Sequence, residues 1–139
     1  MLESMFREWF EGRWTNQRQA YNNPRGQSFV HILHEFDGVN FSCTYRYARQ
    51  KSAYRYFTAA LHHDDGHILL KNPVHDLRFK VQNGCFTTSD EFVSRGIRYV
   101  NEAYLGPTWY HVKDQGFDVK TGRQLWGLEG DEFYEFCPA

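Results

Sequence analysis

The side chains best suited to chemistry in this sequence are an arginine, two aspartates and several tyrosines on segments that alternate polar and apolar residues. Arg55 shares one face of the segment 53–61 with Phe57, Ala59 and Leu61. An arginine on an apolar strand face needs an anionic partner, because an unpaired charge is costly in a low-dielectric interior. That partner is either a ligand carboxylate or an internal Asp or Glu, and the pattern leaves both open.

The histidines and cysteines argue against a metal centre. His31 and His34 are three residues apart, so on a strand their rings lie on opposite faces. The segment 62–67, His-His-Asp-Asp-Gly-His, spans a predicted hairpin turn, where polar side chains are solvated. The three cysteines lack CxxC spacing, which argues against a disulfide framework and a zinc knuckle. We predict no metal site and reduced thiols.

The remaining acidic candidates are Asp114 and Asp118. The segment 113–118, Lys-Asp-Gln-Gly-Phe-Asp, lacks the acidic spacing of an EF-hand loop, so a turn is expected there. GxSxG, HExxH, Walker A and GxGxxG motifs are all missing from the sequence. The chain therefore carries no common signature of hydrolysis, zinc proteolysis or phosphate binding.

Length and composition narrow the class of protein. The 139 residues suit one domain, 1–139, that buries a core without metals or disulfides. A formal net charge of -1 gives no general attraction to nucleic acid or anionic membranes. Neither a signal peptide nor a membrane span is recognisable, so a cytoplasmic location is expected. The unusual quantity is the aromatic content of 18%.

Periodicity predicts one helix followed by many short strands. Residues 2–10 carry apolar side chains at spacings of three and four, typical of a short amphipathic helix lying across a barrel end or face. The segment 22–26, Asn-Asn-Pro-Arg-Gly, supplies a turn, and beyond it the period changes to two. Strands are expected at 28–36, 40–47, 53–61, 67–72, 75–81, 85–89, 92–99, 109–113 and 124–136, the last broken near residue 130. This pattern indicates an all-β barrel or sandwich.

A barrel of this size encloses one small ligand, and its inward-facing residues decide which. On the segment 40–47, Phe41, Cys43, Tyr45 and Tyr47 form one aromatic, weakly polar face.

Four segments, taken in order, resemble the T-type phycobiliprotein lyases. The first, 10–20, contains a Gly, an aromatic residue and Asn-x-x-Gln-Ala, and the second, 53–55, is Ala-Tyr-Arg where the family has Pro-Tyr-Arg. The third, 83–85, is Asn-Gly-Cys. The fourth, 114–127, is close to the family's closing pattern of Asp-x-Gly-x-Asp, a Thr and Trp-Gly. The chain is compact and lacks, between 96 and 107, a cysteine-containing stretch of the family; compactness suits a virus-encoded version.

The resemblance implies a calycin- or lipocalin-like antiparallel barrel with a short N-terminal helix, often a homodimer. It implies no permanent cofactor, but a phycobilin, by analogy phycoerythrobilin, bound as substrate and transferred to a cysteine of an apo phycobiliprotein β-subunit. The expected site has Arg55 on a propionate, tyrosines as walls or hydrogen-bond donors, and an aspartate pairing with protonated pyrroles. The residues assigned to it are Asp118 and Asp114 as the acids, Arg55, Tyr54, Tyr45 and Tyr47 as bilin contacts, and His31 and Trp126 as further pocket candidates. Trp14 and Asn16 are expected to fix the junction between helix and barrel.

Two other functions remain open at this stage. One is a bilin carrier that attaches its pigment to nothing. The other is a lipocalin-like binder of a different hydrophobic acid.

Overall fold

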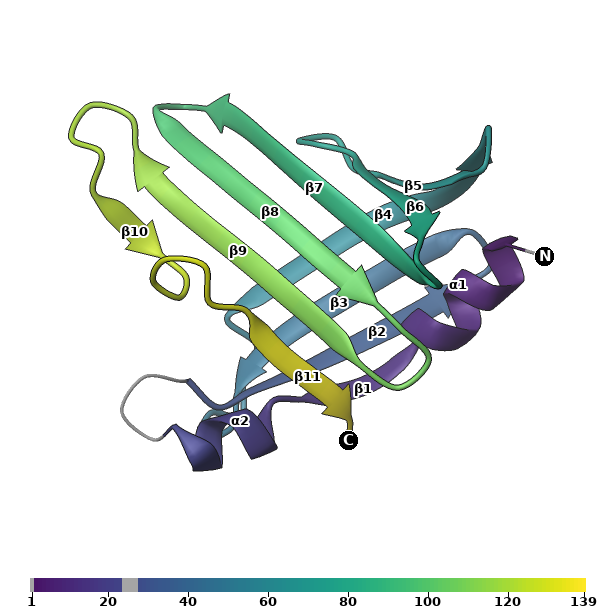
Figure 1. The fold of residues 1–139 in the computed structure, drawn as a ribbon, viewed down its shortest axis with the longest axis horizontal. Helices are drawn as coiled ribbons and strands as arrows, with labels where there is room; N and C mark the ends of the chain where they lie inside the picture. Colours follow the sequence, from purple (N-terminus) through teal and green to yellow (C-terminus); the bar gives the residue numbers. More distant parts are fainter. Residues whose placement is uncertain (1, 24–27) are drawn as a thin grey trace.

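Antiparallel strands wrap into a closed barrel in the computed structural model, which describes residues 2–23 and 28–139 (Figure 1). The strands pair in chain order from β1 to β9, and β11 closes the ring by pairing with both β9 and β1. The helices are α1 (Leu2–Phe10) and α2 (Gln17–Asn22). The strands are β1 (Gly12–Thr15), β2 (Val30–Asp37), β3 (Asn40–Tyr47), β4 (Arg55–Asp64), β5 (His67–Lys71), β6 (Leu77–Gln82), β7 (Cys85–Ser94), β8 (Ile97–Leu105), β9 (Tyr110–Asp118), β10 (Gln124–Trp126) and β11 (Tyr134–Pro138).

The fold class predicted from the sequence is confirmed, and the helix has the expected bounds. One strand prediction is wrong: the segment 92–99 is not a single strand, because it spans the end of β7, a turn and the start of β8. Arg95 and Gly96 form that turn with φ values of 51° and 77°. A positive φ is uncommon for a residue such as arginine, so Arg95 is a weak signal for a turn.

Three further differences concern shorter segments. The turn expected at 113–118 is instead the second half of β9, and the turn begins at Asp118. The strand expected at 124–136 is two short strands, β10 and β11. β1 and α2 were not predicted, because four and six residues are too few to show a clear period. Most of the turn predicted at 22–26 lies outside the described residues.

Helix α1 lies across one end of the barrel (Figure 1). Its buried aromatic side chains fill that end. Phe6 is fully buried, with its ring centroid 5.0 Å from that of Phe79 and 5.2 Å from that of Phe86. Phe10 packs against Phe41 and Tyr110 from the far side of the same cluster. The amphipathic stripe of α1 therefore serves as a plug, and the space left for a ligand lies further along the barrel.

Trp14 fixes the junction between α1 and the barrel, as predicted, whereas Asn16 ties the corner between β1 and α2 to the start of β2. The indole N–H of Trp14 donates to the backbone carbonyl of Phe10 at 3.0 Å. The Asn16 amide donates to the carbonyl of Ser28 at 2.7 Å and accepts from the N–H of Val30 at 2.8 Å. Asn16 is fully buried, so its role is structural.

Within the described residues, neither helix approaches the length and apolar character needed to cross a membrane.

Candidate binding site inside the barrel

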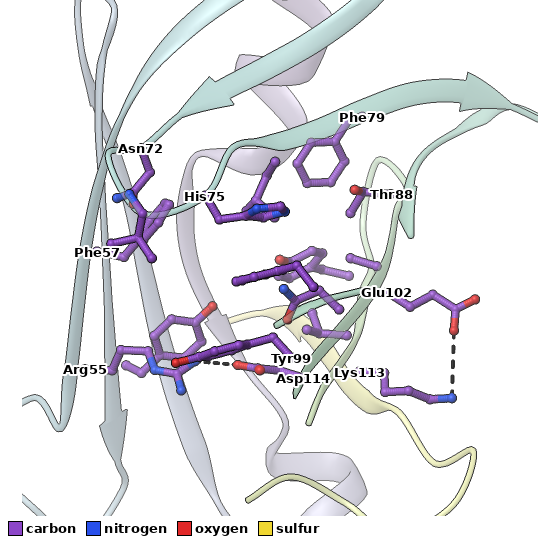
Figure 2. Close-up of a pocket in the computed structure, with 18 of the residues that line it drawn as sticks. Arg55, Phe57, Asn72, His75, Phe79, Thr88, Tyr99, Glu102, Lys113 and Asp114 are labelled. Atoms are coloured by element: carbon purple, nitrogen blue, oxygen red, sulfur yellow. Dashed lines mark hydrogen bonds and ion pairs between the residues drawn. The ribbon is translucent and has the colours of Figure 1, made fainter. Parts of the chain in front are cut away.

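A cavity of about 500 Å³ lies inside the barrel, beyond the rings that α1 buries (Figure 2). It is lined by residues of β3, β4 and β6–β9 and by the loop between β5 and β6. A second cavity of about 270 Å³ adjoins it and shares four lining residues, namely Tyr45, Arg55, Val112 and Asp114. The larger volume falls within the range of about 300–1,000 Å³ typical of small-molecule sites.

An ion pair between Arg55 and Asp114 stands where the two cavities meet (Figure 2). The partner that Arg55 requires is thus an internal aspartate, and the pair borders open space on both sides. Burial is the largest single influence on the Arg55 guanidinium and lowers its pKa, but the charge and hydrogen bond of Asp114, together with Tyr45 and Tyr54, outweigh burial, so the net pKa shift is upward. Arg55 therefore stays cationic at any physiological pH.

Tyr45 and Tyr54 flank this arginine. The guanidinium carbon of Arg55 lies 5.7 Å from the centroid of the Tyr45 ring, a cation–π contact. Burial raises the pKa of both tyrosine hydroxyls, so each remains a neutral hydrogen-bond donor. Tyr47 stacks on Tyr54 with ring centroids 4.3 Å apart, and both rings are more than a third exposed at the border of the smaller cavity.

Trp126 reaches the same carboxylate from β10. Its indole N–H donates to Oδ1 of Asp114 at 3.2 Å, while Arg55 binds Oδ2. Two glycines make this approach possible. A Cβ on Gly116 would lie 2.3 Å from the Trp126 ring, and one on Gly127 would lie 2.4 Å from the backbone oxygen of Asp114. The glycines of the closing pattern, 114–127, therefore leave the space in which the Trp126 indole packs against β9 beside Asp114.

A column of stacked rings continues from Trp126 along the cavity wall. Tyr99 of β8 is 5.5 Å from Trp126, and Phe92 of β7 lies parallel to Tyr99 at 4.7 Å. His75, from the loop between β5 and β6, stacks on Phe92 at 3.7 Å. These rings give the site a long aromatic wall that suits a flat, conjugated ligand.

Two predicted site residues lie elsewhere. The Asp118 carboxylate accepts the backbone N–H groups of Lys120 and Thr121, at 2.8 and 3.1 Å, and holds the turn after β9. His31 occupies the outer face of β2, packed on Phe29, whereas His34 points inward, which confirms that their rings face opposite ways. Neither Asp118 nor His31 lines either cavity among the described residues.

Sequence reasoning missed His75, Phe92, Tyr99 and Asn101. Phe92 and Tyr99 are direct cross-strand partners in the β7–β8 hairpin, and reading 92–99 as one strand hid that pairing. The available signal was Gly96, which sits midway between two alternating aromatic segments.

The cysteines offer the site no reactive thiol of its own. Cys43 is 3% exposed, and burial raises the pKa of its thiol to about 12. Cys85, at the start of β7, also has a pKa raised by burial. Neither thiol borders the two cavities in the described parts of the chain. No cluster of three metal-ligating side chains is found among those residues either.

The fold and the site together define a class: a calycin-like barrel, plugged at one end by an N-terminal helix, with a charged and ring-lined cavity. A solved structure of similar fold is the T-type phycobiliprotein lyase CpeT from Prochlorococcus phage P-HM1. It is 26% identical to this chain, with a TM-score of 0.84, and the match covers 100% of this chain and 98% of the lyase. The resemblance to T-type phycobiliprotein lyases expected from the sequence is confirmed.

A second similar structure is the CRL protein of Arabidopsis. It is 15% identical with a TM-score of 0.74, and the match covers 99% of this chain and 97% of that protein, which shows a shared fold alone. The sequence matches no protein-family model and no curated protein. The near-complete coverage of the phage lyase means that the compact length of this chain is shared with a protein described as a lyase.

Proposed function

We propose that this chain binds a linear tetrapyrrole in its barrel and assists attachment of that pigment to a cysteine of a phycobiliprotein β-subunit. The observation that carries the proposal is the pairing of Arg55 with Asp114 at the meeting point of two cavities, beside an aromatic wall. The similarity to the phage lyase supports the same function. Phycoerythrobilin as the pigment, a homodimer and a cytoplasmic location stay predictions.

Partner exchange at the ion pair explains how the site takes its ligand. A bilin propionate offers Arg55 a carboxylate equivalent to that of Asp114. Once released, Asp114 accepts hydrogen bonds from pyrrole N–H groups and stabilises a protonated tetrapyrrole. The site contains one cation and one anion before binding. After binding it contains two of each, with Arg55 paired to the propionate and Asp114 paired to the protonated tetrapyrrole, so the charges stay balanced.

The attacking thiol belongs to the client. Its sulfur adds to the exocyclic double bond of the bilin, so that a C–S bond forms, the carbon–carbon π bond breaks and the thiol proton ends on the tetrapyrrole. A protonated tetrapyrrole is the better electrophile, which gives Asp114 its role. The barrel otherwise contributes by holding the flexible bilin in one conformation and presenting one end to the client.

The decisive test is an absorbance and fluorescence titration with phycoerythrobilin. The wild-type protein is expected to sharpen and red-shift the bilin spectrum, and Arg55→Ala to weaken binding by about tenfold or more, since hydrogen bonds to charged groups are the stronger ones. Arg78→Ala is the matched control, because Arg78 pairs with Asp64 on the exposed outer surface. No spectral change with the wild-type protein would overturn the proposal.

Transfer is tested separately. Bilin-loaded protein is mixed with apo phycobiliprotein β-subunit, and a zinc-fluorescent covalent adduct is sought on a denaturing gel. An adduct that forms faster than with free bilin supports a lyase. Tight bilin binding without an accelerated adduct identifies a carrier, and preference for fatty acids over bilins in a competition titration identifies a binder of another hydrophobic acid.

A further inference from the structure

A histidine–carboxylate pair lies at the larger cavity, away from Arg55: His75 lines that cavity, and its partner Asp90 borders a neighbouring hollow. His75 forms an ion pair through Nε2 with Oδ2 of Asp90 on β7, and both side chains are about one-third exposed. The His75 ring is also stacked on Phe92 at 3.7 Å with an interplanar angle of 15°. Figure 2 shows His75 and Arg55 on separate parts of the lining, with Tyr99 and Asp114 near the arginine. His75 is thus held in place from two sides.

The strand register places Asp90 at the same height in the barrel as Asp114, the partner of Arg55. Asp90 is directly opposite Asn101 on β8, and Asn101 is directly opposite Asp114 on β9. Residues opposite one another in a sheet point to the same face, so all three positions face the interior. Two strand spacings separate the carboxylates, about 10 Å across the wall. The interior therefore carries a polar row in the order Arg55, Asp114, Asn101, Asp90, His75.

Asn101 is the centre of this row and has hydrogen-bonding capacity to spare. Its side chain borders the cavity, and within residues 2–23 and 28–139 no hydrogen bond is made by its amide. The same holds for Nδ1 of His75, whose other ring nitrogen is taken by Asp90. A protonated imidazole therefore has one N–H donor left for a ligand, next to an amide donor.

Elimination among the basic lining residues points the same way. These residues are Arg55, His75 and Lys113. The Lys113 ammonium is paired with two carboxylates, at 3.8 Å from Glu102 and 3.2 Å from Asp131, and the Asp131 side chain is fully exposed outside the barrel. Among the described residues, His75 is the other basic side chain of this lining whose second nitrogen is open to an anionic ligand.

We propose that the His75–Asp90 pair, together with Asn101, binds the second carboxylate of a dicarboxylic ligand. This inference rests on the proposed function, in which Arg55 binds one propionate of a linear tetrapyrrole and leaves the other without a partner. The cavity then selects for ligands that carry two carboxylates, spaced so that one reaches Arg55 while the other reaches His75 and Asn101. A monoacid of equal hydrophobicity, such as a fatty acid, binds more weakly because it satisfies only one pair.

The test compares phycoerythrobilin with its two monoamides, in each of which one propionate has become a neutral primary amide. Wild-type protein is expected to bind both monoamides less tightly than the diacid, each by about tenfold. His75→Gln keeps a hydrogen-bonding side chain but removes the charge. It is expected to weaken diacid binding by about tenfold while leaving the affinity for one monoamide unchanged. That selective loss distinguishes a carboxylate contact from a general disturbance of the cavity.

Two further variants keep the result interpretable. His62→Gln is the matched control, since His62 is exposed near the end of β4 and outside the cavity, and it should leave all affinities unchanged. If His75→Gln fails to fold by circular dichroism, His75→Phe keeps a ring on Phe92, lacks both nitrogens and should show the same selectivity.

The outcomes separate the two proposals. In one outcome, wild-type protein binds the diacid and the His75 variants lose the same amount of affinity for all three ligands. That outcome overturns the second carboxylate site and leaves the bilin function intact. Equal wild-type affinities for the diacid and both monoamides overturn it as well. Failure of wild-type protein to bind any of the three tetrapyrroles overturns the proposed function and this inference with it.

Discussion

The two ends of the barrel interior are built from the same strands but differ in chemistry. β4 places Leu61, 3% exposed, at the plugged end and Arg55 at the cavity. β3 likewise runs from buried Phe41 to Tyr45, and β9 runs from Tyr110 to Asp114. At the plugged end, rings from α1 fill the space between strands, whereas at the other end charged pairs line open space. One end stabilises the fold, and the other is free to bind.

Phe6→Ala should have the largest effect, because it removes the centre of the plug. Phe6 is fully buried against other rings, and truncating such a residue costs about 3–5 kcal/mol of the free energy of unfolding. Urea denaturation measures the loss, with Val93→Ala at an exposed site as control. Bilin affinity of the folded variant should be unchanged. A loss below about 1 kcal/mol would mean that the plug does not carry the stability of this end.

His34 should make the plugged end sensitive to acid. Burial lowers the pKa of His34 to about 3, and its neutral ring contacts the carbonyl oxygen of Phe10 through Nδ1 at 2.9 Å. The unfolded chain takes up this proton first, near pH 6.5, so the contribution is complete above that pH and declines as pH falls toward 3. The slope should be about 1.4 kcal/mol per pH unit.

The measurement is the free energy of unfolding between pH 7 and 5, above the range where most carboxylates titrate. His34→Gln should flatten the slope, and the exposed His62→Gln should not. Equal slopes in all three proteins would contradict a buried neutral His34.

Gly116→Ala should disturb the cavity end at smaller cost. A methyl group there collides with the Trp126 ring, so the indole must move away from Asp114. Overpacking of this kind costs about 1–3 kcal/mol. Gly106→Ala is a matched control, because its Cβ would meet the Trp109 ring at the same 2.3 Å outside both cavities. Bilin affinity, measured by titration, should weaken only in Gly116→Ala. Equal weakening in both variants would mean that Trp126 does not contribute to the binding site.

Asp118→Asn should have the smallest effect. An amide oxygen still accepts the two backbone N–H groups that Asp118 binds, so stability should fall by about 1 kcal/mol or less. Bilin affinity should not change, whereas Asp114→Asn should weaken it and alter the bilin absorbance. If the two variants weakened bilin binding alike, the acid of the site would not be Asp114 alone.

Alternation and turn residues were enough to predict the helix, an all-β barrel or sandwich, and the apolar strand face that carries Arg55. The family resemblance narrowed the fold to a barrel and assigned Tyr45 and Tyr54 to the same site as that arginine. The partner of Arg55 was not predictable, because Asp114 is 59 residues away and the pairing depends on barrel closure. Local alternation shows which residues share a strand face, but it does not show which distant residues are paired across the closed barrel.

The errors have local causes. Gly116 made 113–118 look like a turn, although the glycine is there to admit the Trp126 ring beside a strand. Because Arg95 is an unusual residue for a tight turn, the turn between β7 and β8 was not predicted. The stacking of Phe92 on Tyr99 was missed for the same reason. Asp118 looked equivalent to Asp114 because both belong to the closing sequence pattern, and the hydrogen bonds that hold Asp118 on the turn separate them.

The edge of β9 that faces away from β8 is shared by two short strands, and this has a mechanical consequence. β11 pairs with residues 110–112 and β10 with 116–117, so the ladder is interrupted beside Asp114. The side-chain amide of Gln115 spans the break by donating to the carbonyls of Leu128 and Gly130, at 2.7 and 3.0 Å. Side-chain contacts such as these hold the wall where backbone pairing is interrupted. This part of the barrel should open before a continuous ladder does, so we expect hydrogen exchange to begin here. A ligand that contacts both Arg55 on β4 and Asp114 on β9 would hold these two strands together and so stabilise the barrel where the pairing along β9 is interrupted.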